Sequence, residues 1–335
     1  MKILFIGNLS STNDKYNYEI LKKKNKVDAI NTEVFLISSK LFYLILYHFY
    51  FNLIETWLFY RFKKRIVKNY DLIWVESGEL LGKKLIENLK KKGSRIVFFC
   101  KDNPFYNRDK SKWRIAKKAL HLYDKVIFHQ PTRIKYAKKN NINFHLIKPV
   151  INKNIFSFSQ RNLKARKFRR DVLMIGTWFK DRGKLARRLI EANINLEIFG
   201  PNWEKDKNYN TLKKFIKSNQ FITGLKYAQI IKYSKMTICL PNVENDDDIT
   251  RKSLEIPLCG SLLLAKNTKS HRKIFKNKFN AILFNNHKDL IKNIKEILKN
   301  KKIMNNISFN GFKSISKNKI FDSEKSIYKI INDLR

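Results

Sequence analysis

Cysteine is scarce in this sequence. Its three cysteines, Cys100, Cys239 and Cys259, are an odd number, lie far apart, and form neither a C-x-x-C pair nor a cluster with histidines at metal-ligand spacing. This pattern argues against a disulfide scaffold and indicates a reducing, cytoplasmic compartment. The amino terminus also lacks the long apolar region and cleavage site of a secretory signal, so the short apolar run at 3–6 predicts a first β-strand.

The glycine-rich signatures of two enzyme classes are missing. No G-x-G-x-x-G follows the predicted strands at 3–6 or 172–175, which disfavours hydride transfer with a nicotinamide or flavin. The segment Gly78-Glu-Leu-Leu-Gly82-Lys-Lys84 is similar to a phosphate-binding loop, but its glycines are one residue too close together. Lys84 also stands where a magnesium-binding Ser or Thr belongs. We interpret it as an ordinary strand-to-helix turn.

Acidic residues are few. Against 28 Asp and Glu stand 71 Lys and Arg, which gives a formal net charge of +43. Such a charge favours phosphate-rich partners or an anionic membrane surface. Residues of A- and T-rich codons (Lys, Asn, Ile, Phe and Tyr) are all plentiful, so base composition is an alternative source of part of this charge. With 335 residues, 43% of them hydrophobic, the chain is long enough for two folded domains.

Only the segment 41–60 approaches the length of a membrane span. On a helix, however, His48, Asn52, Glu55 and Thr56 form one narrow polar stripe, and a charge inside a span costs about 2.5–3.5 kcal/mol. We therefore reject a transmembrane span and favour a helix buried in the first domain. The alternative is an aromatic face in the lipid interface, with basic residues reaching lipid phosphates. Those residues are Arg61, Lys63, Lys64, Arg65 and Lys68.

The two halves of the chain repeat one pattern, in which short apolar β-branched or aromatic runs alternate with stretches of helical length. The predicted strands are 3–6, 34–37, 72–75, 96–99, 126–128 and 145–147, then 172–175, 196–199, 221–222, 237–240, 262–265 and 282–284. This predicts two doubly wound α/β domains, at 1–153 and 154–315, joined by a polar linker at 152–170. A cleft between their sheets would hold the ligand. The segment 316–335, with an amphipathic helix at 322–334, is expected to pack back across the domains.

The acidic triplet Asp246-Asp247-Asp248 allows two interpretations. Its carboxylates could bind Mg²⁺ or Mn²⁺. The triplet also lies in a polar loop just before a predicted helix, where acidic side chains cap the helix amino terminus. We favour capping or solvation.

The most informative stretch is 249–265. On a helix, Arg251 and Glu255 are i and i+4 on one face, so a cation and a carboxylate point the same way. A surface ion pair would be worth under about 1 kcal/mol and would have polar neighbours. Apolar residues at 254, 256 and 258 and an apolar strand at 262–264 instead enclose this helix, which favours a functional pair.

These residues resemble the nucleotide-sugar glycosyltransferases of GT-B architecture, in particular the spore-maturation-protein-like (CgeB-type) branch of the group 1 glycosyl transferases. The stretch 251–260, RKSLEIPLCG, is similar to that branch's R-x-x-x-E-x-x-x-x-G block. The stretch 171–178, DVLMIGTW, followed by Arg182, is similar to the strand, glycine turn and arginine that open the donor domain. The stretch 197–203, EIFGPNW, matches a following strand end. The resemblance covers most of the chain and is strongest in the second half.

The resemblance implies two Rossmann-like domains facing across a cleft. It also implies transfer of a sugar from a UDP-, GDP- or dTDP-sugar to a glycan, lipid-linked or protein acceptor. Arginines and helix amino termini can stabilise the leaving diphosphate, so no metal and no further cofactor is expected. The implied catalytic cations are Arg182 and Arg251. The implied nucleotide-binding residues are Gly176, Thr177, Gly200, Glu255 and Gly260, with Glu255 accepting hydrogen bonds from the ribose.

The acceptor side offers three candidate general bases, Asp102, Glu76 and His129, each at or just after a predicted strand of the first half. Each also has an ordinary structural interpretation: a turn before Asn-Pro, a helix cap and a loop histidine, respectively. We favour Asp102 as the base. A retaining enzyme would not need a separate one.

Two other function classes remain open. A nucleic-acid-binding protein would explain the charge, but here the lysines are spread along both halves without a known reading motif, so no specific nucleic-acid partner is expected. A catalytically inactive scaffold would tolerate loss of Arg251 or Glu255. Binding assays with nucleic acids and with nucleoside diphosphates separate these classes.

Overall fold

The structure is a computed structural model that describes residues 1–34, 52–66, 68–76, 78–106, 112–159 and 167–334. The chain forms two compact units. The first contains 1–148, 242–247 and 323–335, and the second contains 149–241 and 248–322. The domain boundaries expected from the sequence, at 153/154 and 315/316, stay a prediction.

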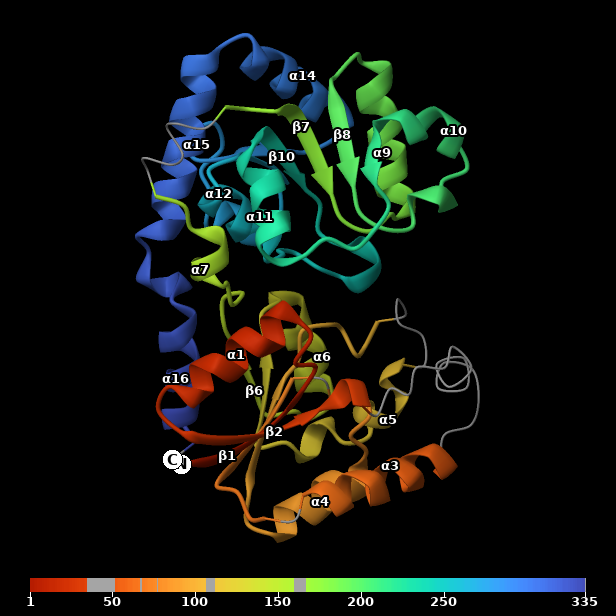
Figure 1. Cartoon of the computed structure of the whole chain (residues 1–335), viewed down its shortest axis with the longest axis vertical. Helices are drawn as coiled ribbons and strands as arrows, with labels where there is room; N and C mark the ends of the chain where they lie inside the picture. The colour runs from red at the N-terminus through yellow and green to blue at the C-terminus, as the bar shows by residue number, and fades with distance from the viewer. Residues whose placement is uncertain (35–51, 67, 77, 107–111, 160–166, 335) are drawn as a thin grey trace. The chain divides into compact units, whose positions relative to one another are not determined.

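The first unit is built on a six-stranded parallel sheet in the order β2-β1-β3-β4-β5-β6. Figure 1 labels β1, β2 and β6 of this sheet. The inner strands are continuous apolar runs that are buried on both faces, as parallel sheets require. The strands are β1 (Lys2–Gly7), β2 (Lys26–Asn31), β3 (Leu72–Val75), β4 (Arg95–Phe99), β5 (Lys125–Phe128) and β6 (Phe144–Leu146).

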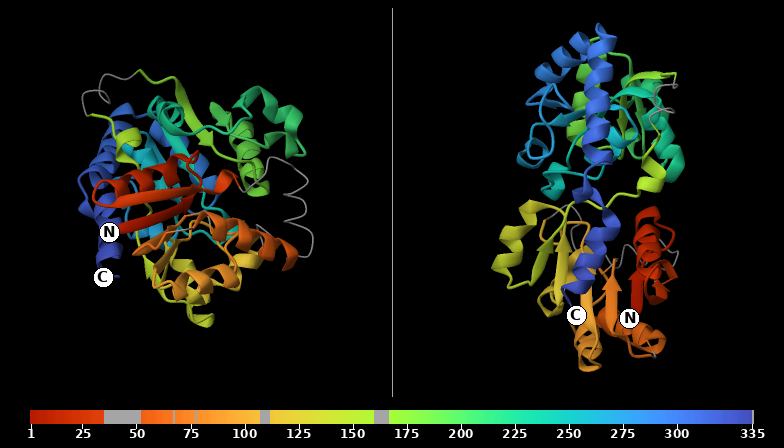
Figure 2. Two further views of the ribbon diagram at one scale, coloured as in Figure 1. Left: turned by 60° about the horizontal axis from the view of Figure 1, so that its bottom comes forward. Right: turned by 90° about the vertical axis from the view of Figure 1, so that its left-hand side faces the viewer.

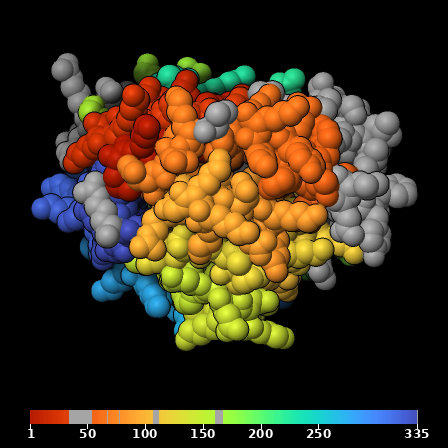
Figure 3. Space-filling view, turned by 90° about the horizontal axis from the view of Figure 1, so that it is seen from below, coloured from red at the N-terminus to blue at the C-terminus, as the bar shows by residue number. Residues whose placement is uncertain are grey.

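Helices link these strands, and the carboxyl-terminal helix joins them: Tyr328 donates a hydrogen bond to the carbonyl of Ile20 at 2.6 Å. On α3, Leu58 and Phe62 are buried in the core. Figure 3 shows one face of the molecule, much of which is drawn in orange. The helices are α1 (Thr12–Lys22), α3 (Asn52–Arg65), α4 (Lys83–Lys91), α5 (Arg114–Lys117), α6 (Ile134–Lys139) and α16 (Ser323–Asn332).

The second unit repeats the design, with the order β12-β11-β10-β7-β8-β9 and every neighbouring pair parallel. Crossover connections through helices are what parallel neighbours need. The strands are β7 (Arg170–Ile175), β8 (Leu196–Phe199), β9 (Ile216–Ser218), β10 (Ser234–Cys239), β11 (Leu262–Lys266) and β12 (Ile282–Phe284).

Helices cover both faces of this second sheet and bury two separate cores. Leu254 of α12 and Ile315 of α15 belong to one core, and Leu185 of α9 and Leu290 of α14 belong to the other. The long α15 packs along α12 and β11 (Figure 2). The helices are α7 (Lys153–Phe156), α9 (Lys180–Glu191), α10 (Tyr209–Leu212), α11 (Gly224–Lys232), α12 (Lys252–Leu258), α13 (Lys269–Arg272), α14 (His287–Leu298) and α15 (Lys301–Ser316).

The predicted α/β class with two doubly wound sheets is confirmed, but two strands were misplaced. The strand expected at 34–37 is instead β2 at Lys26–Asn31. Val34 ends a 3₁₀ turn, and 35–37 lie outside the described residues. The strand expected at 221–222 is β9 at Ile216–Ser218, and Phe221 is a loop residue with 76% of its surface exposed. Both β2 and β9 are edge strands, which pair with a neighbour on one side only. Their sequences are therefore less apolar than those of the inner strands and are harder to recognise.

The apolar segment 41–60 is described only from Asn52 onward, where it forms the first part of α3, and His48 lies outside the described residues. Trp57 and Phe59 are partly buried and pack against the first core. Within the described part of the chain, no helix combines the length and apolarity needed to cross a bilayer. The described part of the segment is thus a partly buried helix, with Tyr60 58% exposed, and the choice between a buried helix and an aromatic face at a lipid surface stays a prediction.

Candidate active site

Two glycines shape the carboxyl edge of the second sheet. Gly176 follows β7 with φ +141°, and Gly200 follows β8 with φ +129°, backbone conformations that favour glycine. A Cβ on Gly200 would collide with the carbonyl oxygen of Gly176. The buried Trp203 donates from Nε1 to that same carbonyl at 3.0 Å. The turn after β7 is thus held in one conformation from two sides.

Two cations converge on this turn. Lys252, at the start of α12, donates from Nζ to the carbonyl of Ile175 at 2.7 Å. Arg182, on α9, donates to the carbonyls of Thr177 at 2.7 Å and Leu240 at 3.3 Å. A Cβ on Gly176 would collide with Lys252 Nζ and would lie 3.2 Å from Arg182 Nη1. An anion at the Gly176 turn would therefore meet two positive side chains at once.

The pKa of Lys252 is lowered to about 8. Burial is the main cause, and the positive charge of the nearby Arg182 contributes to the same shift. A partly buried ammonium beside a second cation is destabilising until a negative charge arrives. An anion between Lys252 and Arg182 would compensate both charges. The electrostatics of this edge of the sheet therefore favour an anionic ligand such as a diphosphate.

A carboxylate follows one turn later on α12. Glu255 is 6% exposed, and Tyr227 of α11 donates to its Oε2 at 3.3 Å. Burial raises the pKa of Glu255, whereas Arg251 and Lys252 act to lower it. The positive charges of Arg251 and Lys252 therefore both act on the Glu255 carboxylate, and the sequence pattern pointed only to Arg251. The Glu255 carboxylate can accept hydrogen bonds from hydroxyl groups of a ligand, and the neighbouring cations can bind its phosphates.

Buried polar contacts fix the first turn of α12. Ser253 Oγ lies 2.7 Å from His271 Nε2, and His271 Nδ1 lies 2.7 Å from the carbonyl oxygen of Lys266. Since a carbonyl only accepts, Nδ1 carries the hydrogen, and the Ser253 hydroxyl donates to Nε2. The N–H of Thr250 in turn donates to Ser253 Oγ at 3.3 Å. Burial lowers the pKa of His271, which keeps the ring neutral. Ser253 thus sets the direction of its neighbour Lys252.

Replacing Ser253 by alanine should lower the affinity for inorganic pyrophosphate about tenfold, because the first turn of α12 loses a buried hydrogen bond that orients Lys252. Ser261→Ala is the matched control, since its hydroxyl shares a buried 2.8 Å hydrogen bond with Thr237 on the same sheet. Both variants should lose about 1–2 kcal/mol in the free energy of unfolding. Calorimetric titration with pyrophosphate and urea denaturation measure the two effects. Equal pyrophosphate affinity in both variants would refute the orienting role.

The second unit brings most of the predicted donor residues to one edge of its sheet. They are Gly176, Thr177, Arg182, Gly200, Arg251 and Glu255. Gly260 lies elsewhere: it ends α12 at the amino edge of the sheet with φ +74°, and its N–H donates to the carbonyl of Pro257 at 2.8 Å. The structure thus gives Gly260 the position of a helix terminator.

Sequence reasoning missed three side chains of this site: Lys252, Trp203 and Tyr227. The sequence did mark Lys252, because a lysine in the first turn of an otherwise apolar helix is unusual. Lys252 and Glu255 are also at positions i and i+3 and so share a helix face. The other two carried none. Large aromatics at these spacings are ordinary core residues, and only the fold shows which polar atoms they meet.

The three candidate bases of the first unit follow β3, β4 and β5 at one edge of that sheet. Glu76 is committed to a buried network: Trp74 Nε1 donates to its Oε1 at 2.8 Å, Asn17 Nδ2 donates to the same atom at 2.7 Å, and Lys101 Nζ lies 2.7 Å from Oε2. Burial raises its pKa, and Lys101 acts in the other direction. Glu76 is a structural residue here, whereas Asp102 and His129 are partly exposed.

The acidic triplet is divided between the two units. Asp247 Oδ1 pairs with Arg133 Nη2 at 2.7 Å in the first unit. In the second unit, Asp248 Oδ2 accepts from the N–H of Ser270 at 2.8 Å, in the first turn of α13. Asp246 adopts a left-handed conformation with φ +53°. Among the described residues, no group of three or more His, Cys, Asp or Glu side chains could hold a metal ion.

Comparisons with known proteins agree with this geometry. Residues 182–319, which include Arg182, Lys252 and Glu255, match the profile of a family described as glycosyl transferase-like. Less than half of the chain thus matches a glycosyl transferase-like family, and the fold of the whole chain is GT-B-like. No curated protein matches the chain in sequence. The expected resemblance is confirmed over residues 182–319 and at the level of the fold.

Solved structures show the same fold over the whole length of the chain. Sucrose-phosphate synthase from Thermosynechococcus elongatus is 14% identical, with a TM-score of 0.69 and 100% of each chain covered. HepE of Anabaena in complex with UDP-glucose is 13% identical, with a TM-score of 0.63 and coverage of 99% and 100%. A UDP-forming trehalose-phosphate synthase from Burkholderia xenovorans is 12% identical, with a TM-score of 0.61 and coverage of 99% and 98%.

Proposed function

We propose that the chain transfers a sugar from a nucleoside-diphosphate sugar to a hydroxyl acceptor, without a metal ion. The observation that carries the proposal is the convergence of Lys252 and Arg182 on the Gly176 turn, with the buried carboxylate of Glu255 one helical turn away. Two cations suit a diphosphate, and one carboxylate suits the ribose hydroxyls of the nucleotide.

The proposed mechanism uses these groups in sequence. As the bond between the sugar's anomeric carbon and the diphosphate oxygen breaks, negative charge grows on the leaving diphosphate. Lys252, Arg182 and Arg251 stabilise that charge in a site with little water, where charge pairing is strong. Glycine at 176 leaves room for the phosphates beside the backbone, and the Thr177 hydroxyl adds a donor. Glu255 anchors the ribose and so fixes the direction in which the diphosphate leaves.

The acceptor hydroxyl attacks the anomeric carbon and loses its proton. If the configuration is inverted, Asp102 is our candidate to take this proton, since Glu76 is held by Trp74, Asn17 and Lys101. Its partly exposed position after β4 leaves it accessible to a substrate. We include glycan, lipid-linked and protein acceptors in the proposal.

For the donor, we favour UDP over GDP and dTDP, because solved structures of the same fold carry UDP-glucose or are described as UDP-forming. For the location, we propose the cytoplasm with peripheral contact at an anionic membrane surface. The exposed basic end of α3, Lys63 to Arg65, supports this contact, and Tyr60 beside it is 58% exposed.

Replacing Glu255 by glutamine tests the assignment of the ribose subsite. UDP affinity should fall about tenfold, because a charge-assisted hydrogen bond to the ribose is lost. Affinity for inorganic pyrophosphate, which has no ribose, should stay the same. Calorimetric titrations with both ligands make the comparison, and Glu197→Gln on β8 is the control for a change in charge. An equal loss for both ligands would contradict the ribose assignment.

The same titrations separate the proposal from its two rivals. A nucleic-acid-binding protein would bind RNA or DNA with a steep salt dependence and ignore UDP. An inactive scaffold would show unchanged function when Arg251 or Glu255 is replaced by alanine. The enzyme would be supported if the unaltered chain binds UDP and if replacing Arg251 or Glu255 by alanine abolishes sugar transfer.

A further inference from the structure

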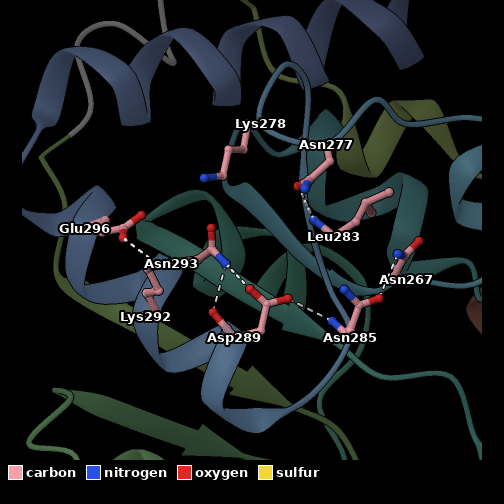
Figure 4. Close-up of a pocket in the computed structure, with 9 residues that line it drawn as sticks. All are labelled: Asn267, Asn277, Lys278, Leu283, Asn285, Asp289, Lys292, Asn293 and Glu296. Atoms are coloured by element: carbon pink, nitrogen blue, oxygen red, sulfur yellow. Dashed lines mark hydrogen bonds and ion pairs between the residues drawn. The ribbon is translucent and has the colours of Figure 1, made fainter.

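A pocket lies beside the edge strand β12, with a volume of about 280 Å³. It has no residue in common with the candidate active site. Figure 4 shows Asp289, Lys292 and Asn293 reaching it from α14, and Asn277 and Asn285 reaching it from the two sides of β12. Its lining is almost entirely polar.

The charged side chains of this pocket balance. Lys278 and Lys292 face Asp289 and Glu296, and Lys292 Nζ lies 3.9 Å from Glu296 Oε1. In a chain with a formal net charge of +43, a pocket with equal numbers of each sign is unusual. Such a pocket repels neither sign strongly and attracts neither, so it suits a neutral ligand.

Hydrogen bonds within the protein fix the direction of two asparagine amides. Asn277 Oδ1 accepts from the N–H of Leu283 at 2.9 Å, and Asn285 Oδ1 accepts from Asn267 Nδ2 at 2.8 Å. Each amide therefore keeps its Nδ2 group as a donor. Both side chains are exposed, so these donors are accessible to a ligand.

A third asparagine is held in the opposite sense. Asn293 Nδ2 donates to both the carbonyl oxygen and Oδ1 of Asp289, at 2.8 and 2.7 Å. Both of its amide hydrogens are used, which leaves Oδ1 as an acceptor. Since Asn293 is only 7% exposed, its side chain cannot easily turn. The pocket thus holds preset donors and preset acceptors side by side.

We propose that this pocket binds a neutral hexose unit of a glycan, at a site separate from the donor nucleotide. Each sugar hydroxyl donates one hydrogen bond and accepts others, and it therefore needs neighbouring acceptors and donors in fixed directions. The amides of Asn277, Asn285 and Asn293 offer this arrangement with little ordering cost. The volume lies near the lower limit of small-molecule pockets, as expected for one sugar ring.

A role in transfer rests on the proposed function. If the chain elongates a glycan, a hexose held at β12 keeps the polymer on the enzyme between transfers. The effective concentration of acceptor ends then rises without any new contact at the active site. The binding of the sugar itself does not depend on donor chemistry.

Two isosteric substitutions test the pocket. Asn277→Asp and Asn285→Asp keep the oxygen that accepts from Leu283 or Asn267 and replace only the free donor. Asn305→Asp is the matched control, because it makes the same charge change at an exposed position on α15 of the same unit. The probes are the methyl glycosides of glucose, galactose, mannose and N-acetylglucosamine, with saturation-transfer NMR and calorimetric titration of the full chain.

At least one glycoside should bind saturably to the unaltered chain, and both pocket variants should bind it at least about tenfold more weakly, with no change in Asn305→Asp. UDP affinity should be the same in all four proteins. Absence of saturable binding by every glycoside, or equal binding in all variants, would overturn the proposal. Sugar binding without UDP binding would leave the pocket standing and refute the proposed function instead, whereas the reverse result would refute only the pocket.

Discussion

Replacing Lys252 by methionine should weaken UDP binding about a hundredfold while leaving the fold intact. Methionine keeps the length and apolar stem of the side chain but removes the ammonium beside Gly176. Charge-assisted hydrogen bonds are worth about 1.5–3 kcal/mol, and the buried site adds to their strength. The free protein should become no less stable, because a buried cation next to Arg182 is removed. Calorimetric titration and thermal denaturation measure the two quantities.

The lowered pKa of Lys252 leads us to expect opposite pH dependences for UDP affinity and for the free energy of unfolding. UDP affinity should fall as the pH rises through about 8, because Lys252 then loses its proton. The unfolded chain keeps that proton up to the ordinary pKa of 10.5 and so binds more protons between these two values. The free energy of unfolding should therefore rise with pH over this window. Both trends should be absent in Lys252→Met.

Lys180→Met supplies the control for general electrostatics, since Lys180 is an exposed lysine at the start of α9. Its UDP affinity should change less than about threefold, as for an exposed and screened charge. An equal loss of affinity in Lys180→Met and Lys252→Met would mean that the net charge, and not this site, attracts the nucleotide.

The sequence was sufficient to predict the architecture because the inner strands are buried on both faces. Runs such as 72–75 and 262–265 are apolar throughout, and both are strands of the two sheets. Lys26–Asn31 mixes polar and apolar residues because it is an edge strand, and the more apolar run at 34–37 gives the stronger strand signal. Placement of edge strands depends on pairing with a distant partner, which the local sequence does not encode.

Positions of the candidate site were predictable from the sequence where a residue type has one characteristic structural role, such as glycine in a turn with positive φ. The glycines at 176 and 200 both have positive φ, and Glu255 is buried beside cations. Spacing alone could not choose between Arg251 and Lys252, because both lie within one turn of Glu255. Gly260 belongs to the same sequence block, yet the length of α12 carries it to the other edge of the sheet. Proximity along the chain did not mean proximity at the site.

Replacing Gly200 by alanine should lower the free energy of unfolding by about 3 kcal/mol or more. Two effects add: φ at Gly200 is +129°, and a new Cβ would collide with the backbone carbonyl of Gly176, which cannot rotate away as a flexible side chain would. Gly224→Ala is the matched control, since Gly224 has φ +61° but open space around it, and it should cost only about 1–2 kcal/mol. Urea denaturation measures both.

UDP affinity adds a second readout for Gly200→Ala. The collision must push the Gly176 turn away from Lys252 and Arg182, so the folded fraction should bind UDP more weakly, whereas folded Gly224→Ala should bind it normally. If Gly200→Ala lost no more stability than Gly224→Ala, the close packing of the turns after β7 and β8 would be refuted. With it would fall the argument that these two turns hold the anion site in one shape, since that argument depends on the Gly176 backbone having no freedom to move.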